Sequence, residues 1–179
     1  MESGVHNEMV YVTGNIPSGT YDSTRLANLS FGFVAVDGGV GYTYLDKSGH
    51  EFSAVGGLTY SFMNHDLQYQ NGIDFHLDWG ASQFVSKNVQ IGLVGYYFQQ
   101  ITGDSGPGAK LGDFKGRVLG IGPQIGFLFP VGEGYQGYLN LKAYKDFAAE
   151  NRPEGYTAWV TLAISPAPPE APKRPSIHK

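Results

Sequence analysis

The chain of 179 residues contains no cysteine and little charge. The absence of cysteine excludes a disulfide scaffold, a zinc ribbon and a thiol nucleophile. Charged residues make up 16% of the chain, well below the share of about a quarter that is usual in globular proteins. Because 14% of the residues are aromatic, this low charge excludes a disordered acidic or basic tail. The formal net charge of −4 gives no reason to expect a nucleic-acid partner.

Long apolar runs are also missing. The two longest uncharged runs, 88–103 and 118–132, contain glutamines and several glycines. Both are shorter than the ~18 apolar residues that a membrane-spanning helix needs, so we expect no such helix. The first seven residues lack a cationic region followed by an apolar core. We therefore expect no secretory signal in this chain and assume a full-length precursor if the protein is exported.

Glycine is abundant instead, with 26 residues, about twice its average share, and much of the chain alternates with a period of two. In 73–79 every odd position is apolar, whereas the even positions are Asp74, His76 and Asp78. A β-strand places successive side chains on opposite faces. This segment therefore predicts a strand with one apolar face and one charged face.

Similar alternation elsewhere predicts eight strands and no helix. The expected strands are 9–14, 29–45, 52–64, 73–82, 89–102, 115–129, 135–147 and 157–164. The alternation changes phase at 37–39, where two glycines follow an aspartate, and we expect a bulge there. Pro123 lies inside an otherwise regular strand and removes one ladder hydrogen bond, so we expect a bulge or kink at this position as well.

The connections between the expected strands alternate between short and long. The segments 46–50, 86–88 and 130–134 are short, whereas 15–28, 64–72, 103–114 and 149–155 are longer. Short turns at one end, long loops at the other and an even strand number are typical of outer-membrane barrels. The sequence thus predicts an all-β, antiparallel, up-and-down transmembrane β-barrel of about eight strands, complete or part of a larger barrel. Its expected parts are an N-terminal extension (1–8), the barrel (9–165) and a proline-rich disordered tail (166–179).

Alternation alone does not distinguish a membrane barrel from a soluble barrel of lipocalin type, in which the apolar face points inward. Three features favour the membrane. The polar rows mix charge signs and aromatic residues, as lumen rows do. The strand that contains Pro123 has glycine at most positions of its other face, which suits a crowded interior. Aromatic residues gather near strand ends, where interfacial girdles lie.

The polar faces supply the candidate solute path. The expected lumen residues are Asp74, His76, Asp78, Gln124, Tyr138, Asn140, Lys142 and Tyr144. The row on 73–79 spaces its polar side chains by roughly 6.8 Å, a spacing that metal ligands can bridge. We favour a solvated lumen row over a metal site, because such rows are polar without binding a ligand. We therefore predict no metal site.

Enzyme signatures are missing. The glycine-rich segment 103–108 is not followed by Gly-Lys-Ser/Thr and a helix, so it is not a phosphate loop. No Gly-x-Ser-x-Gly motif is present. We predict a protein that is not an enzyme, with no catalytic residue and no cofactor.

Several runs in order along the chain carry a family resemblance. They are 41–46, 72–84, 92–96, 100–106, 120–126 and 150–155. With them, nearly all of 9–166 resembles the family of the MetA pathway of phenol degradation, also called SphA-like outer-membrane transporters. The resemblance implies an outer-membrane β-barrel of Gram-negative bacteria that passes small organic molecules. Such proteins are often encoded beside genes for degrading aromatic or other hydrophobic compounds.

Together these observations predict a channel in the bacterial outer membrane for passive uptake of small organic compounds, aromatic or hydrophobic. Its expected partners are outer-membrane lipid and the solute, with no nucleic acid and no identifiable protein partner. Two alternatives stay open. One is a soluble lipocalin-like barrel that binds a small apolar ligand, and the other is a structural outer-membrane barrel without transport.

Overall fold

The computed structural model describes residues 5–25 and 27–167. This part of the chain forms one antiparallel sheet of eight strands and contains no helix. The strands are β1 (Val5–Asn15), β2 (Ala35–Leu45), β3 (His50–Ser61), β4 (Asp74–Phe84), β5 (Val89–Gln100), β6 (Arg117–Pro130), β7 (Tyr135–Glu150) and β8 (Tyr156–Pro166). The predicted all-β, up-and-down architecture is confirmed.

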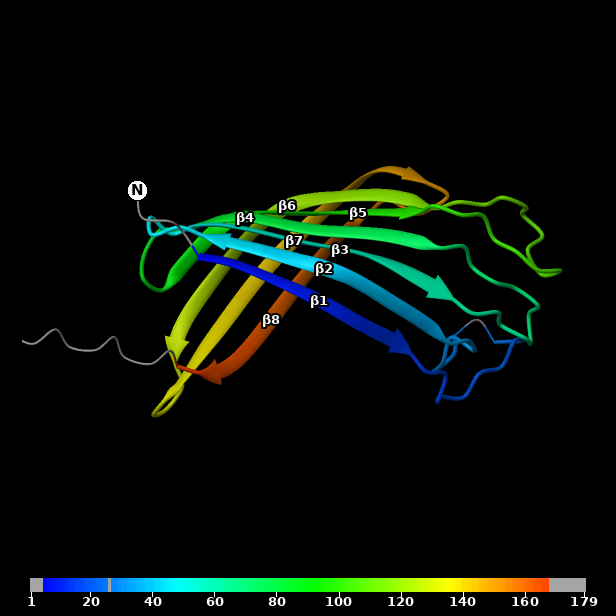
Figure 1. Cartoon of the computed structure of the whole chain (residues 1–179), viewed down its shortest axis with the longest axis horizontal. Coiled ribbons are helices and arrows are strands. Elements are labelled where there is room, and N and C mark those ends of the chain that lie inside the picture. The colour runs from blue at the N-terminus through cyan, green and yellow to red at the C-terminus, as the bar shows by residue number, and fades with distance from the viewer. Residues whose placement is uncertain (1–4, 26, 168–179) are drawn as a thin grey trace, which may run out of the picture.

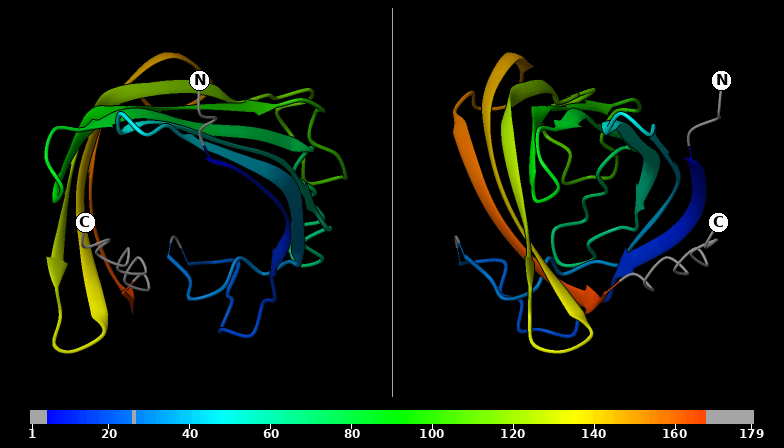
Figure 2. Two further views of the ribbon diagram at one scale, coloured as in Figure 1. Left: turned by 60° about the vertical axis from the view of Figure 1, so that its left-hand side comes forward. Right: turned by 90° about the vertical axis from the view of Figure 1, so that its left-hand side faces the viewer.

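The sheet curls into a half-barrel in which each strand pairs with its neighbours in sequence (Figure 1). Within the described residues β1 and β8 form the two free edges and do not pair with each other. Figure 2 shows the opening between these edges. No described helix is long and apolar enough to cross a bilayer.

The connections separate by length to the two ends of the sheet. The turns β2–β3, β4–β5 and β6–β7 are short and lie together, on the left in Figure 1, and the longer loops lie at the other end. Gly132 and Gly134 have φ angles of 63° and 77° in the β6–β7 turn, a backbone region that favours glycine. The β2–β3 turn is closed by the His50 N–H, which donates to Asp46 Oδ1 at 2.8 Å.

Three expectations about the first strands are wrong. Residues 29–34 form part of the β1–β2 loop, and β2 begins only at Ala35; the chain turns at Gly32, whose φ is 73°. No bulge occurs at 37–39, because β2 pairs in continuous register with β1 and with β3 through this segment. Gly39 leaves room for the hydroxyl of Tyr11, which would lie only 2.7 Å from a Cβ at this position. β1 begins at Val5, four residues before the expected strand start.

Pro123 does not shift the register. The pairs Ile121↔Lys145 and Gln124↔Lys142 lie on either side of it in the same register with β7, and Leu93 pairs with Pro123 on the β5 side. The missing N–H interrupts the ladder toward one neighbour only. The register shift of β6 lies between Arg117 and Leu119 instead.

The two faces of the curled sheet differ in chemistry. Side chains from strands that are not adjacent meet on one face, as Tyr11 of β1 meets His76 of β4, and such meetings require the concave side. The buried polar side chains on the described strands are Ser61, Gln90, Gln100 and Asn140, whereas the only buried hydrophobic ones in the described residues are Val94 and Val118.

The convex face is apolar and exposed. Val10, Val160 and Leu162 are 82%, 72% and 61% exposed. This arrangement inverts that of a soluble protein, whose interior is mainly apolar. Of the tail predicted for 166–179, Pro166 ends β8, and residues 168–179 lie outside the described residues.

Candidate functional site

The predicted row on β4 lies on the concave face, but its members have different surroundings. His76 Nε2 lies 2.8 Å from Asp37 Oδ2 and 3.2 Å from Tyr11 Oη. Asp37 Oδ2 also accepts a hydrogen bond from Thr59 Oγ1 at 2.6 Å. Side chains from four strands, β1 to β4, are thus linked by hydrogen bonds around His76.

Tyr11 reaches β4 because glycines lie beneath it. Tyr11 pairs with Gly39, Gly39 with Gly57, and Gly57 with His76 across the four strands. A Cβ on Gly57 would collide with Tyr11 Oη and would lie 2.8 Å from His76 Nε2. The two missing side chains therefore let the tyrosine lie flat across β2 and β3.

Asp74 and Asp78 lie on either side of His76 and do not form one site with it. Asp74 Oδ2 accepts a hydrogen bond from Asn71 Nδ2 at 2.9 Å, while its buried Oδ1 has no hydrogen-bond partner. Asp78 is directed to the centre of the concave face, where it lines a cavity with Lys142. No three His, Asp or Glu side chains in the described ranges are grouped so that they could hold a metal ion.

The cavity at the centre of the concave face has a volume of about 360 Å³. Six of the eight path residues predicted from the sequence line it: Asp78, Gln124, Tyr138, Asn140, Lys142 and Tyr144. Asp74 and His76 are the two that do not. Within one strand, β7, the period of two brings Tyr138, Asn140, Lys142 and Tyr144 to the same side.

Among the side chains that line the same cavity and that the sequence analysis missed are Glu51 and Gln90. Gln90 Nε2 donates to Ser82 Oγ at 2.6 Å and to a carboxylate oxygen of Glu51. Gln90 Oε1 accepts from Tyr138 Oη at 2.7 Å. The ring of Tyr138 lies over Gly126 to reach this glutamine. The only signal for Gln90 in the sequence is its even position number, which it shares with the other residues of β5 that face the concave side.

Asn140 is the most deeply buried polar side chain of this network. It is 2% exposed, and its Nδ2 donates to Tyr138 Oη at 3.0 Å. Its Oδ1 is buried without a hydrogen-bond donor. A buried acceptor without a donor costs about 1–3 kcal/mol, so the cavity holds an unused acceptor next to the polar groups that line it.

A second tyrosine bridges strands on the other side of the cavity. Tyr96 of β5 donates a hydrogen bond to Asp146 Oδ1 of β7 at 2.5 Å. Its ring lies over Gly120 of the intervening strand and packs edge-on against Tyr144, with 5.5 Å between ring centroids. Sequence reasoning missed this pair because the two residues are 50 positions apart.

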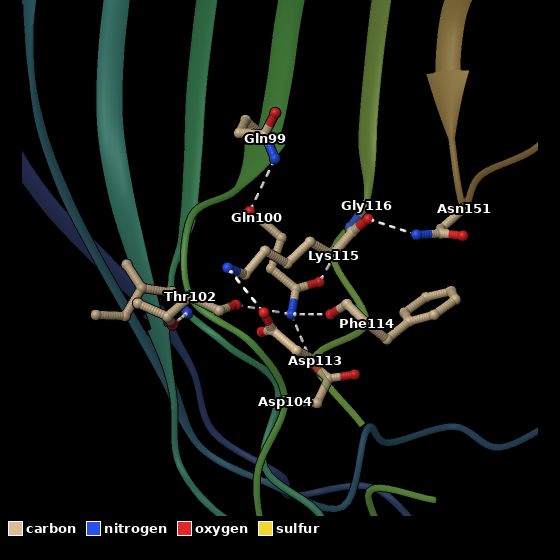
Figure 3. Close-up of polar contacts among 10 residues, drawn as sticks. Gln99, Gln100, Thr102, Asp104, Asp113, Phe114, Lys115, Gly116 and Asn151 are labelled. Atoms are coloured by element: carbon tan, nitrogen blue, oxygen red, sulfur yellow. Dashed lines mark hydrogen bonds and ion pairs between the residues drawn. The ribbon is translucent and has the colours of Figure 1, made fainter. Parts of the chain in front are cut away.

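A polar cluster lies at the long-loop end of the sheet (Figure 3). Gln100 Nε2 donates to Asp104 Oδ1 at 2.6 Å and to the Phe114 carbonyl at 3.1 Å. Asp104 Oδ2 accepts from Tyr69 Oη at 2.6 Å. Burial, together with the hydrogen bond to Asp104, raises the pKa of Tyr69 above its usual value. The β3–β4 and β5–β6 loops are thereby fastened to each other.

The rim of this cluster carries ion pairs and a stacked cation. Lys115 Nζ lies 3.2 Å from Asp113 Oδ2, and Asn151 Nδ2 donates to the Lys115 carbonyl at 2.9 Å. The guanidinium of Arg152 lies 4.1 Å from the centroid of the Phe98 ring. The cluster is therefore mixed in charge.

Comparison with known proteins gives one match. The family model described as "Putative MetA-pathway of phenol degradation" matches residues 2–162. The matched range spans β1 to β7 and most of β8. No curated protein and no solved structure matches the chain.

Proposed function

Because the chain belongs to the family of the MetA pathway of phenol degradation, we propose that it forms an outer-membrane β-barrel for passive uptake of small organic compounds. The observation that carries the proposal is the inversion of polarity across the sheet. The concave face buries glutamine and asparagine, and the convex face exposes valine and leucine. In a membrane barrel the apolar face contacts lipid and the polar face lines the lumen.

The same observation weighs against a soluble lipocalin-like barrel. Such a barrel would need an apolar interior, but the cavity is lined by Asp78, Lys142 and Asn140. Burying these groups against an apolar ligand would leave them without hydrogen-bond partners, at a cost of about 1–3 kcal/mol for each neutral group and more for each charge. A polar solute path does not carry this cost.

Closure of the barrel requires partners for β1 and β8. In lipid, free backbone N–H and C=O groups at a sheet edge are unfavourable by several kcal/mol each. We propose that further strands, from a longer form of the chain or from a second copy, pair with these edges. The strands then surround a path along the concave face.

The residues of the path have distinct roles in this proposal. Tyr138 and Tyr144 offer aromatic faces for brief contacts with an organic solute. Gln124, Asn140 and Lys142 provide hydrogen-bonding groups that replace water during passage. Asp74 and His76 lie nearer the long-loop end of β4 and would be met before the cavity from that side. Passage needs no catalytic group or cofactor, so we propose a channel rather than an enzyme.

Flux through reconstituted vesicles tests the proposal. The full chain is inserted into phospholipid liposomes, and their swelling is measured in benzyl alcohol and in a trisaccharide. Swelling in the small solute alone supports the channel. Correctly folded, inserted protein without solute flux would leave only the structural barrel. A monomer that is stable in buffer without detergent, with Leu141 protected from water, would contradict the membrane placement.

A further inference from the structure

We propose that the concave face selects for cations and that its cavity binds the ammonium group of a small organic cation. This inference rests on the proposed channel function and adds a charge preference to it. It follows from three observations: an excess of carboxylates on one face, an unused buried acceptor in the cavity, and aromatic rings beside it.

The strands carry an excess of acid on the concave face. Strand pairing places five carboxylates there: Asp37, Glu51, Asp74, Asp78 and Asp146. The concave positions of the same strands hold one lysine, Lys142. Counting Arg152, which reaches over the rim to Phe98, still leaves five acidic groups against two basic groups.

Other basic residues do not offset this excess. Lys145 is next to Tyr144 in β7 and therefore lies on the convex face. Arg117 is paired with Glu150 at 2.6 Å, at the long-loop end. Lys115 is paired with Asp113. Walls of one charge sign concentrate ions of the opposite sign in a narrow path, and rings of Asp and Glu are the usual basis of cation selectivity.

Carboxylates outnumber the single cationic group, Lys142, among the residues that line the cavity. Asn140 Oδ1 is buried without a donor, and the carboxylates of Glu51 and Asp78 line the same cavity. An ammonium group has three donors and no acceptor, so it suits this set. A carboxylate solute would instead meet two carboxylates and a single cation, Lys142.

Aromatic rings at the cavity also favour a cationic solute. Tyr144 lines the central cavity, and Trp159 of β8 lies beside it in a neighbouring hollow that also contains Asp78. The faces of such rings attract cations through the negative potential above the ring. Trp159 is 60% exposed, which leaves its ring available to a solute.

Three aromatic solutes of similar size and different charge test the inference: benzylammonium, benzyl alcohol and benzoate. Flux into liposomes that contain the full chain should fall in that order. The zero-current potential across a planar bilayer in a KCl gradient should show preference for K⁺ over Cl⁻. Asp78→Asn and Glu51→Gln should each lower the cation-to-anion permeability ratio roughly fivefold, and Lys142→Gln should raise it.

Matched control variants distinguish a change in charge selectivity from a folding defect and from loss of the channel itself. Glu8→Gln changes a convex-face carboxylate and should leave the permeability ratio unchanged. Asn140→Leu should reduce benzylammonium flux relative to K⁺ conductance, because it removes the acceptor but no charge. Equal flux of the three solutes, or a permeability ratio that the Asp78 and Glu51 variants do not alter, would overturn the inference. Absence of flux and conductance altogether would instead contradict the channel.

Discussion

Three tyrosines on the concave face lie across glycines of nearby strands. Tyr11 lies over Gly57, Tyr96 over Gly120, and a third tyrosine, Tyr138, over Gly126 of β6. A residue without Cβ lets a ring lie flat on the sheet and reach a strand beyond its neighbour. The high glycine content is thus explained in part by these crossings, in addition to turns.

Substitution of Gly57 tests this role. Gly57→Ala should destabilise the protein by about 1–3 kcal/mol, because the new methyl group collides with the Tyr11 hydroxyl and the His76 ring. Gly38→Ala is the control, since its Cβ would approach nothing closer than 3.7 Å. Urea unfolding in detergent micelles measures both. Equal stability of the two variants would show that the crossing is not tightly packed.

The hydroxyl of Tyr96 should also contribute to stability. Tyr96→Phe removes the donor to Asp146 Oδ1 and leaves a partly buried carboxylate oxygen without it, at an expected cost of about 1–3 kcal/mol. Tyr97→Phe is the control, because its hydroxyl donates to Gln99 at 3.1 Å from the opposite face and should cost about 1 kcal/mol or less. Urea unfolding again compares the two variants. A larger loss of stability for Tyr97→Phe than for Tyr96→Phe would contradict the assignment of these side chains to opposite faces.

At the scale of an element, the β2–β3 turn should depend on pH. A hydrogen bond from the His50 backbone N–H and, to a lesser extent, one from the His50 imidazole hold the pKa of the Asp46 carboxyl group below its usual value. A carboxyl group whose pKa is lower in the folded state than in the unfolded state stabilises the fold at pH values above the unfolded-state pKa. This stabilisation is lost as the pH falls through the folded-state pKa. The turn should therefore loosen in acid.

Amide hydrogen exchange measures this loosening. On acidification, exchange at His50 should accelerate relative to Val89, whose N–H in the β4–β5 turn donates to the Ser86 hydroxyl at 3.1 Å. Asp46→Asn should abolish the difference. An Asn variant with unchanged pH dependence would assign the effect to another group.

The two long loops fastened by Asp104 form a second element to test. Asp104→Ala removes acceptors for Tyr69 and Gln100, so trypsin should cleave after Lys110 in the β5–β6 loop about tenfold faster. Asp66→Ala, an exposed position in the β3–β4 loop, is the control and should leave the rate unchanged. Equal rates in both variants would show that the loops hold together without Asp104.

At the scale of the whole molecule, polarity should control insertion into lipid. Val160→Lys puts a charge in the middle of the convex face of β8 and should weaken folding into vesicles by about 2–4 kcal/mol. Thr161→Lys, one residue later, faces the cavity and should have little effect. Urea titration of vesicle-bound protein compares them. A larger loss of stability for Thr161→Lys than for Val160→Lys would contradict a lipid-facing convex side.

Much of the fold follows from the period of two, which is a property of the strand itself. It predicted the eight strands and the common face of Tyr138, Asn140 and Lys142 before any pairing was known. The register shift between Arg117 and Leu119 could not be predicted in this way, because a bulge depends on how two strands pair. The strand expected from residue 29 begins only at Ala35, after Gly32 turns the chain through a positive φ that local alternation does not reveal.

The site was predicted less completely than the fold. Gln90 contacts residues of β3, β4 and β7, so its role arises from register and curvature. The Asp-His-Asp row was predicted to be a polar lumen row without a bound ligand, but its spacing could not predict the partners of its members. His76 lies 2.8 Å from Asp37 of another strand, because the curvature brings other strands closer than its own row.

The simple strand order has a consequence for how such a protein changes over time. Every strand pairs only with its immediate neighbours in sequence, so each hairpin is a separable unit of the wall. Duplicating or deleting one hairpin would widen or narrow the circumference while leaving all remaining pairings intact. The width of the sheet in this architecture can therefore be altered by a single gene rearrangement, without redesign of the remaining strands.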